Sequence, residues 1–218
     1  MFKKYAVLFD MDGVLVDSEP VIAAAAILGL KEYGVTADSE DFIPFVGMGE
    51  DRYIGGVAEK YGVKYELIMK KRVYEIYQEI VDQNLKVYDG TLDLLKKLSA
   101  GSWQFALASS ADRIKVDANL RVAGIDPLCF MVITSGEDVL NKKPSPDIYL
   151  KTAQRVQYNP SDCIVIEDAI SGVKAAKTAG MKCIAVTTSF DATKLVEAGA
   201  DYVCDDISEV FEYIKAID

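Results

Sequence analysis

The stretch FDMDG at residues 9–13 decides the fold of this chain. It ends an apolar run that begins at Tyr5, and a short apolar run bounded by polar residues is typical of a strand buried on both faces. Asp10 and Asp12 therefore stand where a strand leaves a sheet, and open parallel sheets bind ligands at this edge. Clustered carboxylates need a cation, a proton or a basic side chain as compensation. A lone motif of this kind would favour a solvated turn instead. The choice between a ligand site and a solvated turn therefore depends on motifs later in the chain.

The composition argues against some classes of binding partner and excludes some kinds of catalytic chemistry. The chain has 218 residues, 50% of them apolar and 27% charged, with a net charge of −10. An acidic chain argues against a nucleic-acid partner, whose phosphates need a basic face. The sequence contains no histidine, which excludes Ser-His, Cys-His and His-metal schemes. Acid-base chemistry then falls to Asp, Glu, Lys or Tyr.

The four cysteines are widely spaced, and three of them lie inside apolar runs. We interpret them as buried core residues with no disulfide or zinc role. No apolar run is long enough to span a bilayer, and the first predicted strand leaves little room for a signal peptide. We therefore expect a cytoplasmic protein, a monomer without a membrane partner.

The order of the predicted elements indicates an α/β fold with an insertion. Residues 17–86 show only helical patterns, and Ser18 before Pro20 is typical of a helix N-cap. From residue 87 onward strands and helices alternate, which predicts a doubly wound, Rossmann-like parallel sheet. We predict a core formed by residues 1–16 and 87–218, and a helical cap formed by residues 17–86. The expected helices of the cap are 21–33, 39–45, 52–61 and 65–81, and the later strands are 104–109, 130–134, 163–167, 182–186 and 202–204.

Carboxylate, hydroxyl and lysine side chains occur at four places, after predicted strands or in a loop before a predicted helix, and all should meet at one edge of the sheet. They are Asp10, Asp12, Ser109, Ser110, Lys143, Glu167 and Asp168. Each has a plain alternative as an N-cap, a solvated acid or a surface lysine, but their convergence favours a site. Several carboxylates without histidine suit Mg²⁺, while a lysine and a hydroxyl beside such an ion suit a phosphoryl group. A carboxylate could serve as nucleophile and a second one as acid and base.

Four segments resemble, in order, the motifs of the haloacid dehalogenase-like (HAD) hydrolase superfamily. They are Asp10-Met-Asp12-Gly-Val, Ser109, Lys143-Pro144-Ser-Pro146-Asp147 and Ile166-Glu167-Asp168-Ala. The helical insertion after the first motif is similar to that of the C1-capped branch, which holds β-phosphoglucomutase and phosphoglycolate phosphatase. The resemblance covers core and cap.

This resemblance implies a role for each matching residue. Asp10 would be the nucleophile and a metal ligand, and Asp12 the general acid-base, whose backbone carbonyl would also bind the metal. Asp168, and less directly Glu167, would hold Mg²⁺. Lys143 would pair with Asp10 and the phosphate.

The serines at the end of the second motif would contact the substrate. Ser109 would hydrogen-bond the phosphoryl group, with Ser110 beside it. An aspartate at position 12 points away from dehalogenases and toward phosphate chemistry. The implied enzyme is a phosphoric monoester hydrolase that acts on a small phosphorylated metabolite through an aspartyl-phosphate.

The glycine-punctuated turn in the cap is a candidate for substrate selection. Gly47, Glu50 and Arg52 either face the site or form a solvated turn before a helix. The β-phosphoglucomutase group uses a cap histidine and a cap arginine, and their positions fall here on Ile22 and near Glu50. We therefore predict release of phosphate, with a β-phosphoglucomutase-type phosphomutase or a non-catalytic metal- or partner-binding module as alternatives.

Overall fold

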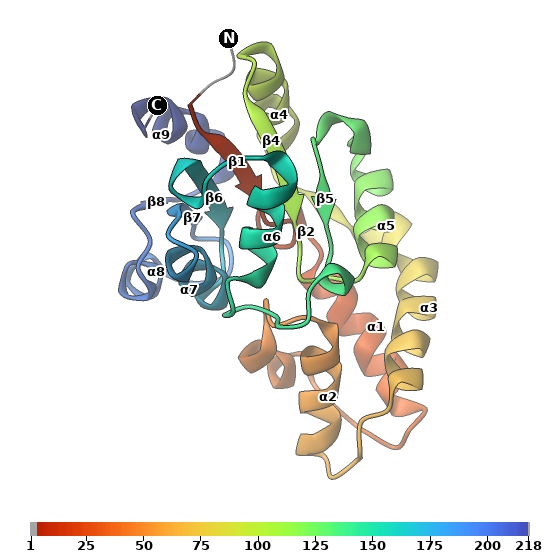
Figure 1. Cartoon of the computed structure of the whole chain (residues 1–218). Coiled ribbons are helices and arrows are strands. Elements are labelled where there is room, and N and C mark those ends of the chain that lie inside the picture. The colour runs from red at the N-terminus through yellow and green to blue at the C-terminus, as the bar shows by residue number, and fades with distance from the viewer. Residues whose placement is uncertain (1–3, 218) are drawn as a thin grey trace.

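The strand that ends at Phe9 lies in the middle of a parallel sheet (Figure 1). The computed structural model describes residues 4–217; residues 1–3 and 218, which the sequence assigns to the core, lie outside it. Within the described residues six strands pair in the order β5-β4-β1-β6-β7-β8, all parallel. Their bounds are β1 Ala6–Phe9, β4 Gln104–Ala108, β5 Ile133–Thr134, β6 Cys163–Glu167, β7 Lys182–Val186 and β8 Tyr202–Cys204.

Helices cover both faces of this sheet. Val7 and Phe9 of β1 point to a core shared with α4, α5 and α9, whereas Ala6 and Leu8 point to a core shared with α6, α7 and α8. This alternation is the period of two that a strand imposes on its side chains. The helices are α4 Thr91–Ala100, α5 Arg113–Ala123, α6 Asp147–Val156, α7 Ile170–Thr178, α8 Ala192–Ala198 and α9 Val210–Ile217. The predicted doubly wound α/β fold is confirmed.

The chain between β1 and β4 carries a helical segment beyond the carboxyl ends of the strands (Figure 1). Two short strands, β2 Val16–Asp17 and β3 Lys86–Val87, pair antiparallel where the chain enters and leaves this segment. The segment has its own apolar cluster, in which Gly29 leaves room for Val73. Ala118 of α5 joins that cluster and so connects the two parts. The segment contains α1 Glu19–Lys31, the 3₁₀ helix η1 Ser39–Phe45, α2 Glu50–Lys60 and α3 Leu67–Asn84.

Three local predictions differ from the structure. The strand expected at 130–134 is reduced to Ile133–Thr134, because a 3₁₀ turn over Pro127–Cys129 delays its start. The helix at 39–45 is a 3₁₀ helix that contains Pro44, a residue that cannot donate a backbone hydrogen bond. Ser18 occupies the N-cap position of α1, but its side chain makes no capping hydrogen bond.

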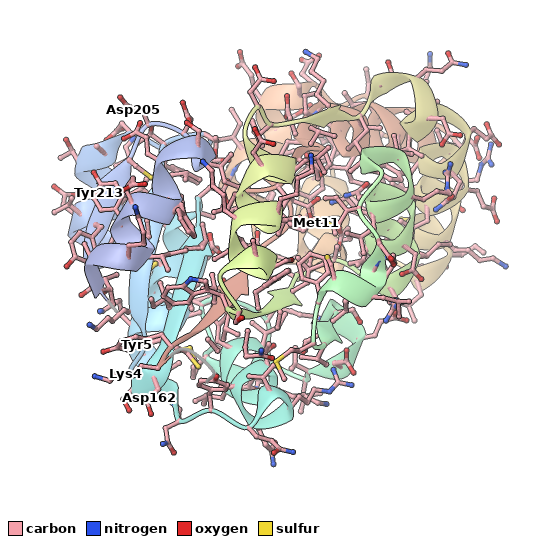
Figure 2. All side chains as sticks on the ribbon, turned by 90° about the horizontal axis from the view of Figure 1, so that it is seen from above. Lys4, Tyr5, Met11, Asp162, Asp205 and Tyr213 are labelled. Carbon is pink, nitrogen blue, oxygen red and sulfur yellow. The ribbon has the colours of Figure 1, made fainter. Side chains whose placement is uncertain are left out.

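Met11, in the loop after β1, is completely buried and lies in the middle of the molecule in Figure 2. In the same view Lys4 and Tyr213 lie toward the outer edge of the molecule. The four cysteines lie within the described residues and are free thiols. None of the helices in residues 4–217 is long and apolar enough to cross a membrane.

Candidate active site

The loop that follows β1 turns its two carboxylates in different directions. The Asp10 N–H still donates to the Ile166 carbonyl at 3.0 Å, so Asp10 continues the pairing with β6 and is only 6% exposed. Gly13 has a φ of +80°, and a Cβ there would lie 1.9 Å from Oδ2 of Asp168. Only glycine fits both the backbone conformation and this close approach.

Lys143 links the first and last motifs. Its Nζ lies 2.7 Å from Oδ1 of Asp10 and 2.6 Å from Oε1 of Glu167, and its side chain is 1% exposed. Glu167 is itself fully engaged: Oε1 also accepts from the Tyr149 hydroxyl, and Oε2 accepts from the N–H groups of Asp168 and Ala169. Glu167 therefore fixes the lysine and the loop that carries Asp168.

The acid-base properties of these groups follow from burial. Burial raises the pKa of Asp10 to about 7, although the Lys143 ammonium opposes the shift. Burial and the neighbouring Glu167 raise the pKa of Asp168 well above its usual range. For Glu167 burial is again the largest effect, but the Lys143 ammonium and the hydrogen bonds from Lys143, Ala169 and Asp168 together outweigh it, and the pKa is lowered. Three buried carboxylates thus face one ammonium, so the cluster carries an excess of negative charge when all three are ionised, and a cation or protons must compensate it.

This excess of negative charge fits a divalent cation. One oxygen each from Asp10, Glu167 and Asp168 lies within 4.8 Å of the others, and all three residues are buried. An all-oxygen donor set suits Mg²⁺, and this cluster lacks the sulfur or imidazole ligands that softer metals prefer. Asp168 also accepts a hydrogen bond from the Ser189 hydroxyl, which fixes its orientation.

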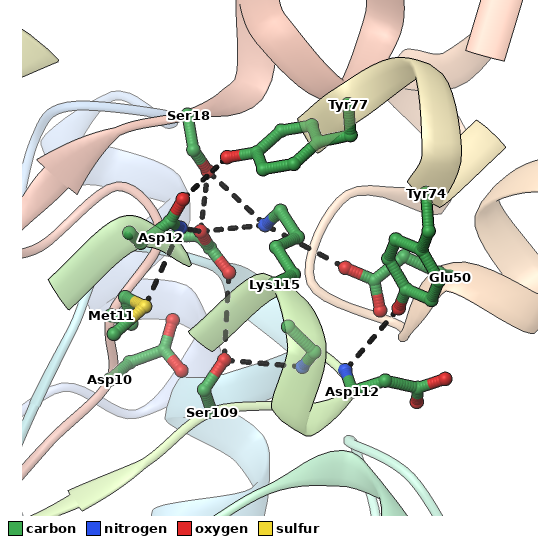
Figure 3. Close-up of polar contacts among 12 residues, drawn as sticks. Asp10, Met11, Asp12, Ser18, Glu50, Tyr74, Tyr77, Ser109, Asp112 and Lys115 are labelled. Carbon is green, nitrogen blue, oxygen red and sulfur yellow. Dashed lines mark hydrogen bonds and ion pairs between the residues drawn. The ribbon is translucent and has the colours of Figure 1, made fainter. Parts of the chain in front are cut away.

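Asp12 has a separate set of partners (Figure 3). Its Oδ1 accepts from the Ser18 hydroxyl, from Asn119 Nδ2 at 3.1 Å and from Lys115 Nζ at 2.6 Å. Its Oδ2 lies 3.5 Å from the Ser109 hydroxyl, which in turn accepts the N–H of Ala111. The side chain of Asp12 is therefore turned away from the acidic cluster and held in position by several donors.

Lys115 is the residue that sequence analysis missed most clearly. It lies on α5, its side chain is 2% exposed, and it reaches Asp12, Ser18 and Glu50. Asn119, one turn further along α5, lies on the same face. Nothing in the local pattern separates Lys115 from a solvated lysine, because only the packing of the helical segment over α5 buries it.

A second missed pair follows β7. Thr188 donates to the Gly13 carbonyl and Ser189 to Asp168, so both brace the first and last motifs. The sequence does indicate this pair, because its hydroxyl residues follow the carboxyl end of a predicted strand just as Ser109 and Ser110 do.

A small cavity of about 30 Å³ opens above the two aspartates and is lined by both parts of the chain. Gly47 and Glu50 line it, whereas Arg52 is not among its lining residues and pairs instead with Glu59 at 3.2 Å, with half of its side chain exposed. Ser110 also lines the cavity, and its hydroxyl has no hydrogen-bond partner among the described residues. The remaining lining residues include Asp10, Asp12, Glu19, Ile22, Tyr53, Lys115 and Asp168.

Comparison with known proteins agrees with this architecture. The sequence pattern of the family described as haloacid dehalogenase-like hydrolase matches residues 7–186. A phosphorylated carbohydrates phosphatase of Thermotoga maritima is 34% identical over 198 residues, which cover 89% of this chain and 91% of that protein. The chain belongs to the haloacid dehalogenase-like hydrolases. The predictions of this superfamily and of an enzyme of the phosphoric monoester hydrolase class are confirmed.

Two further similarities define the relationship. The Arabidopsis thaliana protein SUPPRESSOR OF QUENCHING 1, chloroplastic, is 43% identical over 215 residues; these cover 95% of this chain but only 20% of that protein. The crystal structure of a putative β-phosphoglucomutase from Thermotoga maritima superposes with a TM-score of 0.76 at 32% identity, covering 98% of this chain and all of the other. The similarity thus includes the helical segment as well as the sheet.

Proposed function

We propose that this protein is a Mg²⁺-dependent phosphatase that hydrolyses a small phosphorylated metabolite through an aspartyl-phosphate on Asp10. One observation carries the proposal: Asp10, fixed by Lys143, and Asp12, fixed by Lys115, both line one cavity. The two carboxylates therefore face the same substrate with different partners, which suits a nucleophile and an acid-base. The similarity to a phosphorylated carbohydrates phosphatase of Thermotoga maritima supports this proposal.

The proposed reaction has two steps, and residues of this chain take part in each bond change and proton transfer. An Asp10 oxygen bonds to phosphorus as the bond from phosphorus to the leaving oxygen breaks, and Asp12 gives its proton to that oxygen. Water then attacks the aspartyl-phosphate, its proton passes to Asp12, and Asp10 is released with inorganic phosphate. Lys143 and Ser109 stabilise the phosphoryl oxygens throughout.

Mg²⁺ would be held by Asp10 and Asp168, by the Asp12 backbone carbonyl, and less directly by Glu167. When bound, it neutralises charge on the phosphoryl oxygens. Both oxygens of Glu167 already accept hydrogen bonds, so its main contribution is to position Lys143 and Asp168.

Phosphate release is favoured over isomerisation. Ile22 lines the cavity where the mutase group is expected to have a histidine, and the sequence contains none. Arg52 forms its pair with Glu59 instead of lining the cavity. An assay with β-glucose 1-phosphate and glucose 1,6-bisphosphate should yield free phosphate with negligible glucose 6-phosphate. Rapid glucose 6-phosphate formation with little phosphate would favour the mutase.

The nucleophile is tested by Asp10→Asn. We expect this variant to lose hydrolysis of p-nitrophenyl phosphate and to keep the circular dichroism of the native fold. Asp93→Asn, at a position with a largely exposed side chain on α4, is the matched control and should retain activity. Wild-type turnover in Asp10→Asn would refute the assignment of the nucleophile. If the wild-type protein binds metal but hydrolyses no phosphate ester, the alternative of a non-catalytic module is favoured and the proposal fails.

The division into a core of residues 1–16 and 87–218 and a cap of 17–86 belongs to the same proposal. The β2–β3 pair at both crossings and the separate apolar cluster of the helical segment support it. The monomeric state and the cytoplasmic compartment remain predictions, as does the absence of nucleic-acid and membrane partners. Light scattering of the purified protein tests the first.

A further inference from the structure

The part of the cavity beyond the reacting carboxylates has an unusual lining. Glu19 comes from α1, Glu50 from α2 and Lys115 from α5, with Ile22 and Tyr53 among the remaining residues. A leaving group bound to a phosphate at Asp10 would have to occupy this space. These side chains therefore face the alcohol part of the substrate.

Among the described residues that line the cavity, Lys115 is the one cation, and its ammonium already has three polar neighbours. Its Nζ lies 2.6 Å from Asp12, 3.2 Å from the Ser18 hydroxyl and 3.6 Å from Glu50. An ammonium has three N–H donors. Asp12 and Ser18 lie within hydrogen-bond distance, and Glu50 is an ion-pair partner just beyond it. A second anionic group of a substrate would therefore have to compete with Glu50 for this ammonium.

Two polar atoms on the cavity wall have no hydrogen-bond partner among the described residues. They are Oε2 of Glu50 and the hydroxyl of Ser110, on residues that are each 7% exposed. Figure 3 shows the Glu50 carboxylate between Lys115 and Tyr74. The Tyr74 hydroxyl accepts the N–H of Asp112 and also interacts with the Glu50 carboxylate, without a hydrogen bond of good geometry to Oε2. A buried carboxylate oxygen that is only weakly satisfied is costly, and a hydroxyl of a bound alcohol would supply a well-aligned donor.

Charge on this wall has one sign. Burial raises the pKa of Glu19 and that of Glu50 to about 7, so both carboxylates are largely ionised at pH 8. Beside Asp12 they face the Lys115 ammonium, the one cation of the described lining, and Tyr53 adds a hydroxyl that is paired with Glu19. A second phosphate or a carboxylate on the leaving group would meet uncompensated negative charge in a partly buried cavity, where screening is weak. A hydroxyl would meet acceptors.

We propose that Glu19 and Glu50 form a selectivity wall that admits phosphate monoesters of uncharged, hydroxyl-bearing alcohols and rejects leaving groups with a second anionic group. This inference rests on the proposed phosphatase function and names its class of substrate. Both glutamates act by contact with the leaving group, and Lys115 acts by holding Asp12 and Glu50 in place.

Three esters of nearly equal size test the wall at pH 8. They are 2-hydroxyethyl phosphate, phosphoglycolate and phosphoethanolamine, whose leaving groups are neutral, anionic and cationic. For the wild-type protein we expect kcat/KM for the neutral ester to exceed that for phosphoglycolate by about tenfold or more, mainly through KM. Glu19→Gln and Glu50→Gln should each reduce this ratio by at least about threefold, while Glu59→Gln, at a largely exposed position on α2, should leave it unchanged.

Each outcome has a defined meaning. Equal kcat/KM for phosphoglycolate and the neutral ester in the wild-type protein overturns the proposal, and this result does not depend on any variant folding. A ratio unchanged in both folded Gln variants overturns the role of the wall. A tenfold preference for phosphoethanolamine over the neutral ester overturns the neutral class in favour of a cationic one. If no ester is hydrolysed, p-nitrophenyl phosphate included, the proposed function itself fails.

Discussion

Replacing Lys115 by methionine tests how the helical segment and the sheet share one buried charge. Methionine keeps most of the volume of the side chain and removes the ammonium. Asp12 would lose its contact at 2.6 Å, and Glu50 its contact at 3.6 Å. Both carboxylates would remain largely buried, with side chains 16% and 8% exposed. The variant should therefore be less stable and less active.

The size of the effect follows from these contacts. Removing one partner of a buried ion pair costs about 3–5 kcal/mol, because the other charge stays buried. For a chain of this length 1 kcal/mol shifts Tm by roughly 2–4 °C, so we expect Tm to fall by roughly 6–20 °C. Asp12 keeps Ser18 and Asn119 as partners. Activity should therefore fall toward the lower end of the range for lost acid-base catalysis, about 10²-fold in kcat.

Thermal unfolding and steady-state kinetics measure both effects. Lys194→Met is the matched control, because Lys194 is 57% exposed and pairs with Asp191 at 2.9 Å. An exposed pair of this kind contributes little to stability, since solvent screens it. Adding Glu50→Gln to Lys115→Met should restore part of the lost stability, since it removes one of the stranded charges. A Tm for Lys115→Met within about 2 °C of the control would refute the reasoning.

Two further predictions concern the metal and the turn after β1. Chelator-treated protein should be inactive and recover with Mg²⁺, while Ca²⁺ should bind without supporting turnover because of its larger, looser shell; full activity of metal-free protein in a phosphate-release assay would contradict this. Gly13→Ala should abolish turnover and lower Tm, because its Cβ would lie 1.9 Å from Oδ2 of Asp168. Gly34→Ala shares a positive φ, +82°, but its Cβ would meet no atom within 4 Å, so it should keep activity; equal activity losses in the two variants would contradict the packing argument.

The glycine at position 13 also shows how far local sequence determines this protein. A short apolar run with D-x-D-G at its end already specifies a buried strand, the turn and two carboxylates at the edge of the sheet. The same logic placed Ser109, Lys143 and Asp168 at that edge, because polar residues at the carboxyl ends of parallel strands must converge. Thr188 and Ser189 obey this rule as well and could have been predicted from it.

What only the tertiary structure decided is the environment of Asp12. Lys115 and Ser18 look like a surface lysine and a helix cap in sequence, since charged and hydroxyl side chains are exposed by default. The helical segment packs against α5, which buries Lys115 and brings it to Asp12 and Glu50. Burial and the pairing of charges distant in the chain are properties of the assembled fold. The sequence therefore determined the groups that we propose to react, whereas packing determined how they are held and what lines the cavity around them.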